Sequence, residues 1–240
     1  MVLAVIPARF ASSRLPGKAL ADIGGVPMIV RVWERVRAVP AVDTVLVATD
    51  DARIAEVARD AGAEVAMTGP CATGTDRVAE AARLHAPGLR ETDVVVNVQG
   101  DEPFVDPADI GAVAAAVGDC PIATASAPLL GDPTDPARVK VVTDHTGRAL
   151  YFSRLPVPSG GPWRVHVGVY AFAAWALAEV AALPPSPLER AESLEQLRWL
   201  QAGYAIRVVP VAVAHFSIDT PADLERARRA CPKHSSGVRA

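Results

Sequence analysis

The sequence has 240 residues, of which 50% are hydrophobic and 21% are charged, and its formal net charge is -3. A chain of this length can bury a large core, and the small negative charge argues against a nucleic-acid-binding protein, which normally presents a basic face. The cysteines, Cys71, Cys120 and Cys231, are an odd number without metal-type spacing, so we expect neither a disulfide framework nor a zinc site. We expect a cytoplasmic protein without a membrane segment, because the start lacks a signal peptide's basic region and no apolar run reaches the roughly 18 residues of a span.

The chain opens with an apolar run, Val2 to Ile6, which is rich in β-branched residues and is followed by Pro7. This pattern predicts a strand that is buried on both faces. The loop after it carries basic and small polar residues, namely Arg9, Ser12, Arg14 and Lys18. Cations at the carboxyl end of a central strand suit a polyphosphate, because open α/β sheets bind their ligands there. The alternative is a basic loop that simply faces solvent.

Helix and strand patterns then alternate along the chain. Apolar residues at spacings of three and four, Ile29, Val32 and Val36, predict an amphipathic helix. The next expected elements are a strand at 45–49, a helix that ends at Gly62 and a short strand at 64–67. This order predicts an α/β fold with a Rossmann-like, mostly parallel sheet flanked by helices. The GxGxxG fingerprint is missing, which argues against a dinucleotide.

The stretch TGTDR, Thr73 to Arg77, predicts the start of another helix. Thr73 or Thr75 can cap that helix, and Gly74 beside the helix N-terminus would let backbone amides approach a ligand closely. An ordinary capped helix without a ligand is the alternative.

The stretch DVVVNVQGDEPF predicts a second buried strand, Val94 to Val98, that ends in polar residues. Gln99, Asp101 and Glu102 follow this strand at its carboxyl end. Two neighbouring carboxylates are costly to hold together unless a cation lies beside them, so we expect a cation site here. A helix-capping acidic turn is the alternative, but Asp106 fits that role better.

The second half of the chain predicts a change of topology. A helix at 107–117 and a strand at 122–129 precede an antiparallel hairpin formed by 140–143 and 149–152. We therefore expect one domain over residues 1–230, with a nucleotide-binding half at about 1–130 and a small mixed part at about 131–230. Residues 231–240 are expected to be a mobile tail.

Near the C-terminus, SIDTPADL predicts a capped helix start. Thr220 is the expected N-cap, followed by Pro221 in the first turn and by Asp223 at the position of a capping box. Asp219 lies just outside this box, so capping does not explain its presence.

Five separated motifs resemble those of the CMP-Kdo synthetases, the 3-deoxy-manno-octulosonate cytidylyltransferase family. Four of them are single stretches: ARFASSRLPGK, TGTDR, VQGDEP and SIDTPADL. The other is a group of three short segments, YFSR, HVGVY and SLEQLR. Together the motifs span about residues 2–230. The resemblance implies that CMP is transferred from CTP to an acidic acceptor with release of pyrophosphate. It also implies a homodimer. One position departs from the family pattern, since Cys71 stands where a His is usual before the TGT segment.

The resemblance also implies roles for individual residues. Catalysis would involve Arg9, Arg14, Lys18 and Asp101, and the nucleotide would be bound by Arg9, Ser12, Lys18, Thr73, Gly74, Arg77 and Asp101. Asp101 and Asp219 would hold the cofactor Mg²⁺. The acceptor would be bound by Gln99, Arg154, His166, Tyr170, Glu195 and Gln196. From the residues alone, His166 could be structural and Glu195 could belong to the exposed face of a helix.

The acceptor expected by default is Kdo. The connection from Leu155 to Val165 is short and rich in Pro and Gly, shorter than in the family, so a smaller acidic acceptor such as a phosphonate is the alternative. Two other classes are also considered. A glycosyltransferase would typically show a DxD pattern instead of QGDEP, and a non-catalytic nucleotide-binding regulator would be expected to lose some of the cations or carboxylates.

Overall fold

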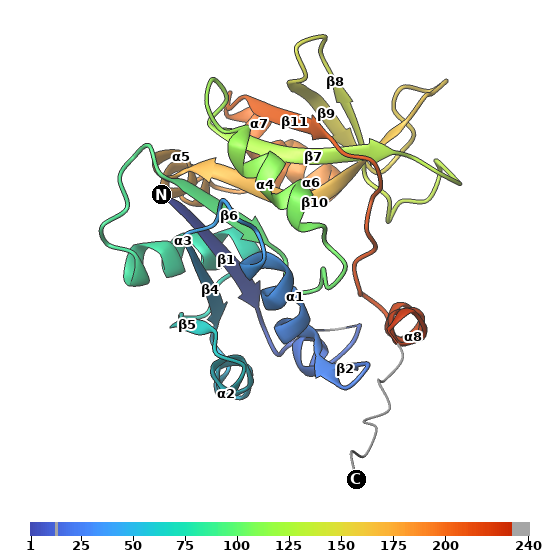
Figure 1. The fold of residues 1–240 in the computed structure, drawn as a ribbon. Helices are drawn as coiled ribbons and strands as arrows, with labels where there is room; N and C mark the ends of the chain where they lie inside the picture. Colours follow the sequence, from blue (N-terminus) through green and yellow to red (C-terminus); the bar gives the residue numbers. More distant parts are fainter. Residues whose placement is uncertain (13, 232–240) are drawn as a thin grey trace.

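A sheet of nine strands forms the centre of the computed structural model, which describes residues 1–12 and 14–231 (Figure 1). Seven of the strands are hydrogen-bonded in the order β11 (Ile206–Pro210), β7 (Ile122–Pro128), β10 (Arg164–Ala173), β6 (Val94–Val98), β1 (Val2–Ala8), β4 (Thr44–Thr49) and β5 (Glu64–Met67). The hairpin of β8 (Lys140–Thr143) and β9 (Ala149–Ser153) joins this sheet through β10.

The first half of the chain forms the predicted parallel sheet around β1. This strand pairs in parallel with β4 on one side and with β6 on the other. Its residues Leu3 to Ile6 are fully buried, which confirms the prediction of a strand covered on both faces. A central parallel strand is buried in this way because the helices of the crossover connections pack on both faces of the sheet.

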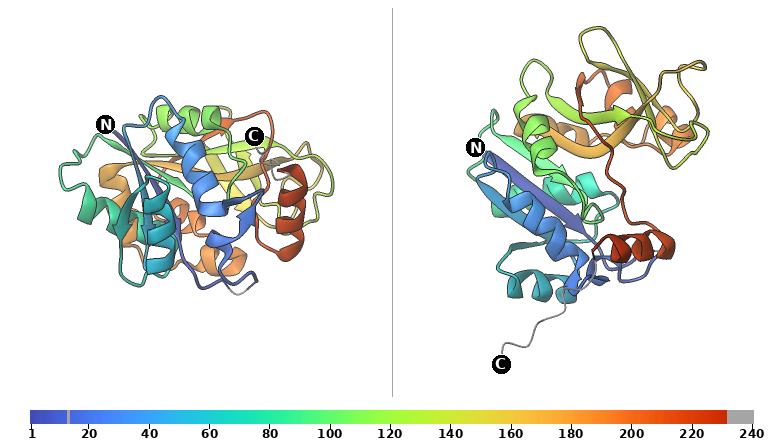
Figure 2. Two further views of the ribbon diagram at one scale, coloured as in Figure 1. Left: turned by 60° about the horizontal axis from the view of Figure 1, so that its bottom comes forward. Right: turned by 45° about the vertical axis from the view of Figure 1, so that its right-hand side comes forward.

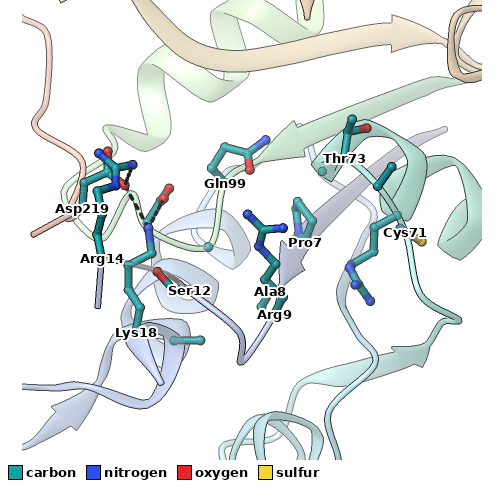
Figure 3. A pocket seen from close by; sticks show the side chains of 16 residues that line it. Pro7, Ala8, Arg9, Ser12, Arg14, Lys18, Cys71, Thr73, Gln99 and Asp219 are labelled. Carbon is teal, nitrogen blue, oxygen red and sulfur yellow. Dashed lines mark hydrogen bonds and ion pairs between the residues drawn. The ribbon is translucent and has the colours of Figure 1, made fainter. Parts of the chain in front are cut away.

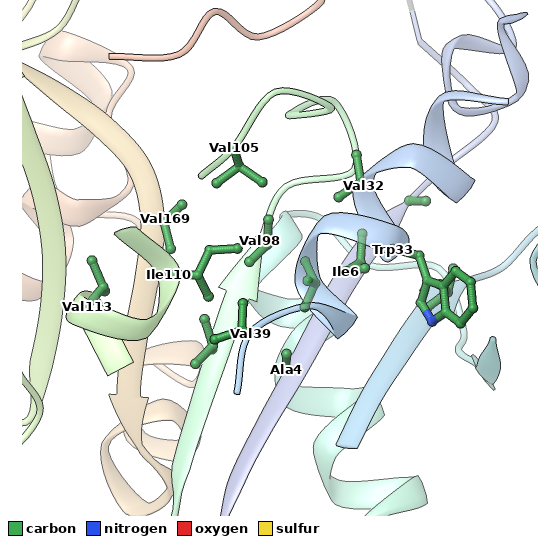
Figure 4. Packing of buried hydrophobic residues seen from close by; sticks show 14 of the residues in the cluster. Ala4, Ile6, Val32, Trp33, Val39, Val98, Val105, Ile110, Val113 and Val169 are labelled. Atoms are coloured by element: carbon green, nitrogen blue, oxygen red, sulfur yellow. The ribbon is translucent and has the colours of Figure 1, made fainter. Parts of the chain in front are cut away.

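Helices cover both faces of the sheet. One face packs against α1 (Met28–Arg37), α2 (Ala52–Asp60) and α4 (Pro107–Ala115). The other face packs against α3 (Gly74–His85), α5 (Ala174–Ala181) and α7 (Gln196–Gln201). The short helix α6 (Pro187–Glu192) precedes α7. Figure 4 shows the first of these layers, where Ile6 and Val98 of the sheet pack near Val32 of α1 and Ile110 of α4. Because β1 and β6 are paired in parallel, the loops at their carboxyl ends are adjacent.

The second half of the chain is mixed, as the sequence predicts. β10 is antiparallel to both β6 and β7, while β11 is parallel to β7. The predicted hairpin is confirmed as β8 and β9. One helix boundary differs from the prediction, since α4 ends at Ala115 and not at residue 117. Helix α3 begins at Gly74, and its N-cap is Thr73, one of the two expected caps.

The C-terminal part returns to the first half of the molecule. After β11 the chain runs along the side of the sheet to α8 (Pro221–Ala230), which lies beside the small hairpin of β2 (Asp22–Ile23) and β3 (Val26–Pro27) (Figures 1 and 2). Ile218 and Leu224 pack there with Ile23 and Met28, the residue that begins α1. The predicted capping box of Thr220 and Asp223 is confirmed. This return brings residues near position 219 to the carboxyl end of β6.

No helix within the described residues combines the length and the apolar character that a membrane crossing would need. From residue 232 onward, the tail predicted at 231–240 lies outside the described residues.

Candidate active site

A cavity of about 270 Å³ lies at the carboxyl ends of β1 and β6 (Figure 3). The loop after β1, the start of α3, the end of β6 and the segment before α8 all contribute to its walls. The predicted site residues that line it are Arg9, Ser12, Arg14, Lys18, Thr73, Gly74, Arg77, Gln99, Asp101 and Asp219. The structure therefore brings together the predicted nucleotide and metal residues, as expected for the switch region of an open α/β sheet.

The loop after β1 is anchored through the ring of Phe10. Gly17 has a φ of 68°, and a Cβ at this position would lie 3.3 Å from the Phe10 ring. The guanidinium carbon of Arg53 lies 3.3 Å from the ring centroid, and Arg53 is paired with Asp51 at 2.6 Å. A glycine at position 17 thus allows both the left-handed backbone and the close ring. These contacts tie the basic loop to the start of α2.

Lys18 joins two carboxylates that are far apart in the sequence. Its ammonium nitrogen lies 2.6 Å from Oδ2 of Asp101 and 3.1 Å from Oδ1 of Asp219. Arg14 contacts the same Asp219 oxygen at 2.9 Å. Burial alone would lower the pKa of Lys18, but the two carboxylates outweigh burial and raise it, so Lys18 is charged at neutral pH. Lys18 is therefore not part of a basic loop that merely faces solvent.

The pair of Asp101 and Asp219 fits a Mg²⁺ ion by its chemistry. Both carboxylates already converge on one cation, the Lys18 ammonium. Mg²⁺ in nucleotide-using enzymes is commonly held by one or two carboxylates, with water and phosphate oxygens as its other ligands. The described residues contain no group of three or more His, Cys, Asp or Glu that could hold a metal by themselves. A Mg²⁺ ion at this pair would therefore take its other ligands from water and from phosphate oxygens of the nucleotide.

Glu102 adds little charge to this pair. Its side chain is half-buried, and burial, followed by the charges of Asp101 and Asp219, raises the pKa of Glu102 to about 8. Glu102 is then largely protonated at neutral pH.

The start of α3 is built by Thr73, whose hydroxyl accepts from the backbone N–H of Asp76 at 3.1 Å in a complete capping box. Arg77 lines the cavity, but its guanidinium already donates to Asp50 at 2.8 Å and to the hydroxyl of Thr68. Cys71, at the position where the family usually has His, donates its thiol to Glu80. Burial and then this bond raise the pKa of Cys71 to about 11, so it remains a neutral thiol.

Two predicted acceptor residues lie against the start of α3. The amide nitrogen of Gln99 donates to Oδ1 of Asn97 at 3.0 Å. A Cβ added at Gly74 would lie 3.1 Å from the amide oxygen of Gln99, so glycine allows this close approach. Glu195 accepts hydrogen bonds from the hydroxyls of Thr73 and Thr75, each at 3.0 Å. Glu195 is thus half-buried and bonded, and it does not belong to an exposed helix face.

His166 and Tyr170 lie together on β10, with ring centroids 5.3 Å apart. Burial lowers the pKa of His166 to about 4, so the ring is neutral, and Nε2 lies 3.0 Å from the hydroxyl oxygen of Thr124. Within the described part of the chain, the buried hydroxyl of Tyr170 has no hydrogen-bond partner. Gln196, the first residue of α7, is also buried. None of these residues lines the cavity, and their acceptor roles remain predictions.

Arg154 is placed differently from its expected role. Its guanidinium donates to three backbone carbonyls, those of Glu192 at 2.7 Å, Pro136 at 2.8 Å and Ser193 at 3.1 Å. It is not among the residues that line the cavity. These bonds give Arg154 a structural role that the sequence did not predict, and direct contact with an acceptor carboxylate remains only a prediction.

A family model described as Cytidylyltransferase matches residues 3–207. The 3-deoxy-manno-octulosonate cytidylyltransferase of Anaeromyxobacter sp. (strain Fw109-5) is 53% identical over 235 residues, which cover 95% of each chain. The chain belongs to this cytidylyltransferase family. A protein of the same name from Chlorobaculum tepidum is 48% identical, over 94% of this chain and 95% of that protein. A solved structure of CMP:2-keto-3-deoxy-manno-octonic acid synthetase complexed with CTP is 40% identical, with a TM-score of 0.89 over 95% of this chain and 97% of that chain.

Membership in the cytidylyltransferase family decides between the classes considered from sequence. The protein is a nucleotidyltransferase, so the glycosyltransferase and the non-catalytic regulator are wrong. The phosphonate alternative finds no support, because relatives about half identical to this chain over nearly its whole length carry the Kdo name. The short connection at 155–165 therefore does not by itself indicate a different acceptor.

The roles of three residues in this cytidylyltransferase site were not predicted from the sequence. Asn97 orients the Gln99 amide, and Thr75 holds Glu195. Gly100 lines the cavity, where a Cβ would lie 2.9 Å from the carbonyl oxygen of Pro7. Asn97 gave a usable signal, since it is the single polar residue in the apolar run VVVNV. The role of Thr75 gave none, because its partner is 120 residues away.

Proposed function

We propose that this cytidylyltransferase transfers CMP from CTP to Kdo in a Mg²⁺-dependent reaction that releases pyrophosphate. The names of its relatives support the nucleotide and the acceptor. The observation that carries the chemistry is the convergence of Lys18, Asp101 and Asp219 in one cavity at the ends of β1 and β6. This arrangement places a cation and two carboxylates where a nucleotide phosphate is expected.

The basic residues of the cavity would bind and neutralise the triphosphate. Arg9, Arg14 and Lys18 all line the cavity, and the Phe10 contacts anchor the loop that carries Arg9 and Arg14. Phosphoryl and nucleotidyl transfer need little covalent help from the protein and depend mainly on positioning and on charge stabilisation. Lys18 and the arginines would stabilise negative charge on the pyrophosphate as it leaves.

In the proposed reaction an acceptor oxygen attacks the α-phosphorus of CTP. The new phosphorus–oxygen bond forms as the bond to the bridging oxygen breaks, and pyrophosphate carries away the bonding electrons. The proton of the acceptor hydroxyl is released to solvent. When bound, Mg²⁺ supplies Lewis-acid chemistry and offsets phosphate charge. Asp101 and Asp219 would hold it, and Lys18 would remain close enough to contact the phosphates.

The acceptor would lie on the side of the cavity formed by Gln99 and the start of α3. Glu195, Gln196, His166 and Tyr170 are the proposed contacts for its hydroxyl groups, as the family resemblance implies. The unpartnered hydroxyl of Tyr170 supports this placement, since a buried donor is costly to leave unpaired. The neutral state of His166 means that it would act as a hydrogen-bonding group and not as a positive charge.

We also propose a cytoplasmic homodimer. The free cysteines Cys71, Cys120 and Cys231 suit a reducing compartment. Leu150 on β9 and Leu155 just after it are 62% and 68% exposed, which suits a surface that a second copy covers. Light scattering coupled to size exclusion would test the dimer, and a monomer at micromolar concentration would contradict it.

The test of this function is a pyrophosphate-release screen. Purified protein is mixed with each of the four nucleoside triphosphates and with Kdo, another sugar acid or phosphonoformate, with Mg²⁺ or with EDTA. We expect release only with CTP, Kdo and Mg²⁺ together. Release that is independent of an acceptor, or efficient use of phosphonoformate without use of Kdo, would contradict the proposal.

A further inference from the structure

Thr75 belongs to the first half of the chain, but its buried hydroxyl is hydrogen-bonded to a residue of the second half, Glu195. Thr75 lies in the first turn of α3 and is only 2% exposed. Its hydroxyl donates to Oε2 of Glu195 at 3.0 Å, and the hydroxyl of Thr73 donates to Oε1 at the same distance. Each oxygen of one carboxylate is therefore held from the nucleotide side of the site.

The backbone next to Glu195 is fixed by contacts within the second half of the chain. Ser193 has a φ of 53°, which makes a sharp turn between α6 and α7. Arg154 donates to the carbonyls of Glu192 and Ser193 within this turn. The position of Glu195 is thus set by the second half of the chain, while the orientation of its carboxylate is set by α3.

Helix α3 does not need the Thr75 hydroxyl for its own formation. Its capping box uses Thr73 and Asp76, and both bonds of the box are present. The hydroxyl of Thr75 is instead directed at a carboxylate in another element. A purely local role in starting the helix therefore does not account for it.

A carboxylate oxygen can accept about two hydrogen bonds, so each oxygen of Glu195 keeps acceptor capacity after its bond to threonine. A carboxylate with a fixed orientation suits two neighbouring hydroxyls of a polyhydroxylated ligand. We infer that Thr75 is a positioning residue for the acceptor, because its buried hydroxyl fixes the orientation in which Glu195 receives hydroxyl groups of a sugar acid. This inference rests on the proposed function of the same site.

The test compares Thr75→Val, which removes the hydroxyl at nearly constant volume, with Thr75→Ser, which keeps it. Thr75→Ala is a second variant without a hydroxyl that cannot overpack the site. The matched control is Thr49→Val, since Thr49 is also buried and its hydroxyl accepts from the Asp51 backbone. KM for Kdo and KM for CTP are measured separately, and CTP affinity is followed by calorimetry.

Loss of one hydrogen bond to a charged group should raise KM for Kdo by about ten-fold in Thr75→Val and Thr75→Ala. KM and affinity for CTP should change less than about two-fold, and Thr75→Ser and Thr49→Val should resemble the wild type. An unchanged KM for Kdo, an equal rise in both KM values, or failure of serine to rescue would overturn the inference. A wild-type protein that does not use Kdo would instead overturn the proposed function, and this inference with it.

Discussion

Lys18, Asp101 and Asp219 are the residues on which the proposed chemistry depends. The ammonium of Lys18 keeps two carboxylates of different elements within reach of one cation. Held without any cation, the two negative charges would repel each other. Burial, and after it the charges of Asp101 and Asp219, raises the pKa of the neighbouring Glu102. The two negative charges also favour the binding of a divalent cation at this point.

Replacing either carboxylate should stop the reaction and leave the fold intact. Asp101→Asn and Asp219→Asn each remove one charged oxygen from the proposed Mg²⁺ ligands, so kcat/KM should fall by about 100-fold or more. The side chains are 25% and 35% exposed, and a partly exposed ion pair of this kind adds at most about 1 kcal/mol to the free energy of unfolding. Steady-state kinetics and thermal melting would check both parts. Near-normal Mg²⁺-dependent turnover in either variant would contradict the assignment.

At the scale of elements, the turn between α6 and α7 is held by the side chain of Arg154. Its donors bond to carbonyls on two segments of the second half, at Pro136 and at 192–193. The planar fork of a guanidinium can reach several carbonyls at once, and an ammonium cannot. This structural role and direct contact with the acceptor carboxylate make different predictions for a conservative substitution.

Arg154→Lys keeps the positive charge but loses the planar guanidinium, whose several donors bond to the backbone carbonyls. If Arg154 acts by holding the turn, KM for Kdo should rise about as much in Arg154→Lys as in Arg154→Ala, by roughly ten-fold, with KM for CTP unchanged. Kinetics with each substrate varied in turn would measure this. Substantial recovery of acceptor affinity in Arg154→Lys would show that the charge matters, and it would restore the role expected from sequence.

Local sequence patterns correctly predicted the buried strands and the capped helix starts, because these depend on residues that are neighbours in the sequence. Val2 to Ile6 and Val94 to Val98 read as buried strands and are so, and Thr73 and Thr220 cap the helices they were expected to cap. The neighbours of β10 could not be predicted, because nothing in its own sequence states that it inserts antiparallel between β6 and β7. The partners of Lys18 and Arg154 were missed for the same reason, since they depend on contacts between distant segments.

At the scale of the whole molecule, the site depends on the return of the chain after β11. The backbone N–H of Ile218 donates to the carbonyl of Asp101 at 3.0 Å, so the segment before α8 is bonded directly to the end of β6. Ile218, Leu224 and Ala227 are buried with Ile23 and Met28 in a small cluster of their own. Asp219 is therefore held in place by the docking of α8 on the first half of the chain.

Weakening this docking should impair metal use more than an equal loss of stability elsewhere. Leu224→Ala should cost about 2–4 kcal/mol of local stability and raise the Mg²⁺ concentration for half-maximal activity several-fold. The matched control is Leu177→Ala in α5. Leu177 is 2% exposed and packs in a different cluster, on the face of the main sheet that α3 and α7 cover. This control substitution should lower the melting temperature and leave the Mg²⁺ requirement unchanged. An equal Mg²⁺ requirement in both variants would contradict the role of α8.

The proposed CMP transfer is tested by following the fate of CTP with ³¹P NMR in a reaction with Kdo and Mg²⁺, using the wild-type protein and Asp101→Asn in parallel. We predict that the wild type converts CTP into equal amounts of pyrophosphate and a CMP–Kdo phosphodiester, that EDTA stops the conversion, and that Asp101→Asn shows almost none. Formation of CDP and phosphate, or of free CMP without a phosphodiester to Kdo, would contradict the proposed transfer of CMP to Kdo.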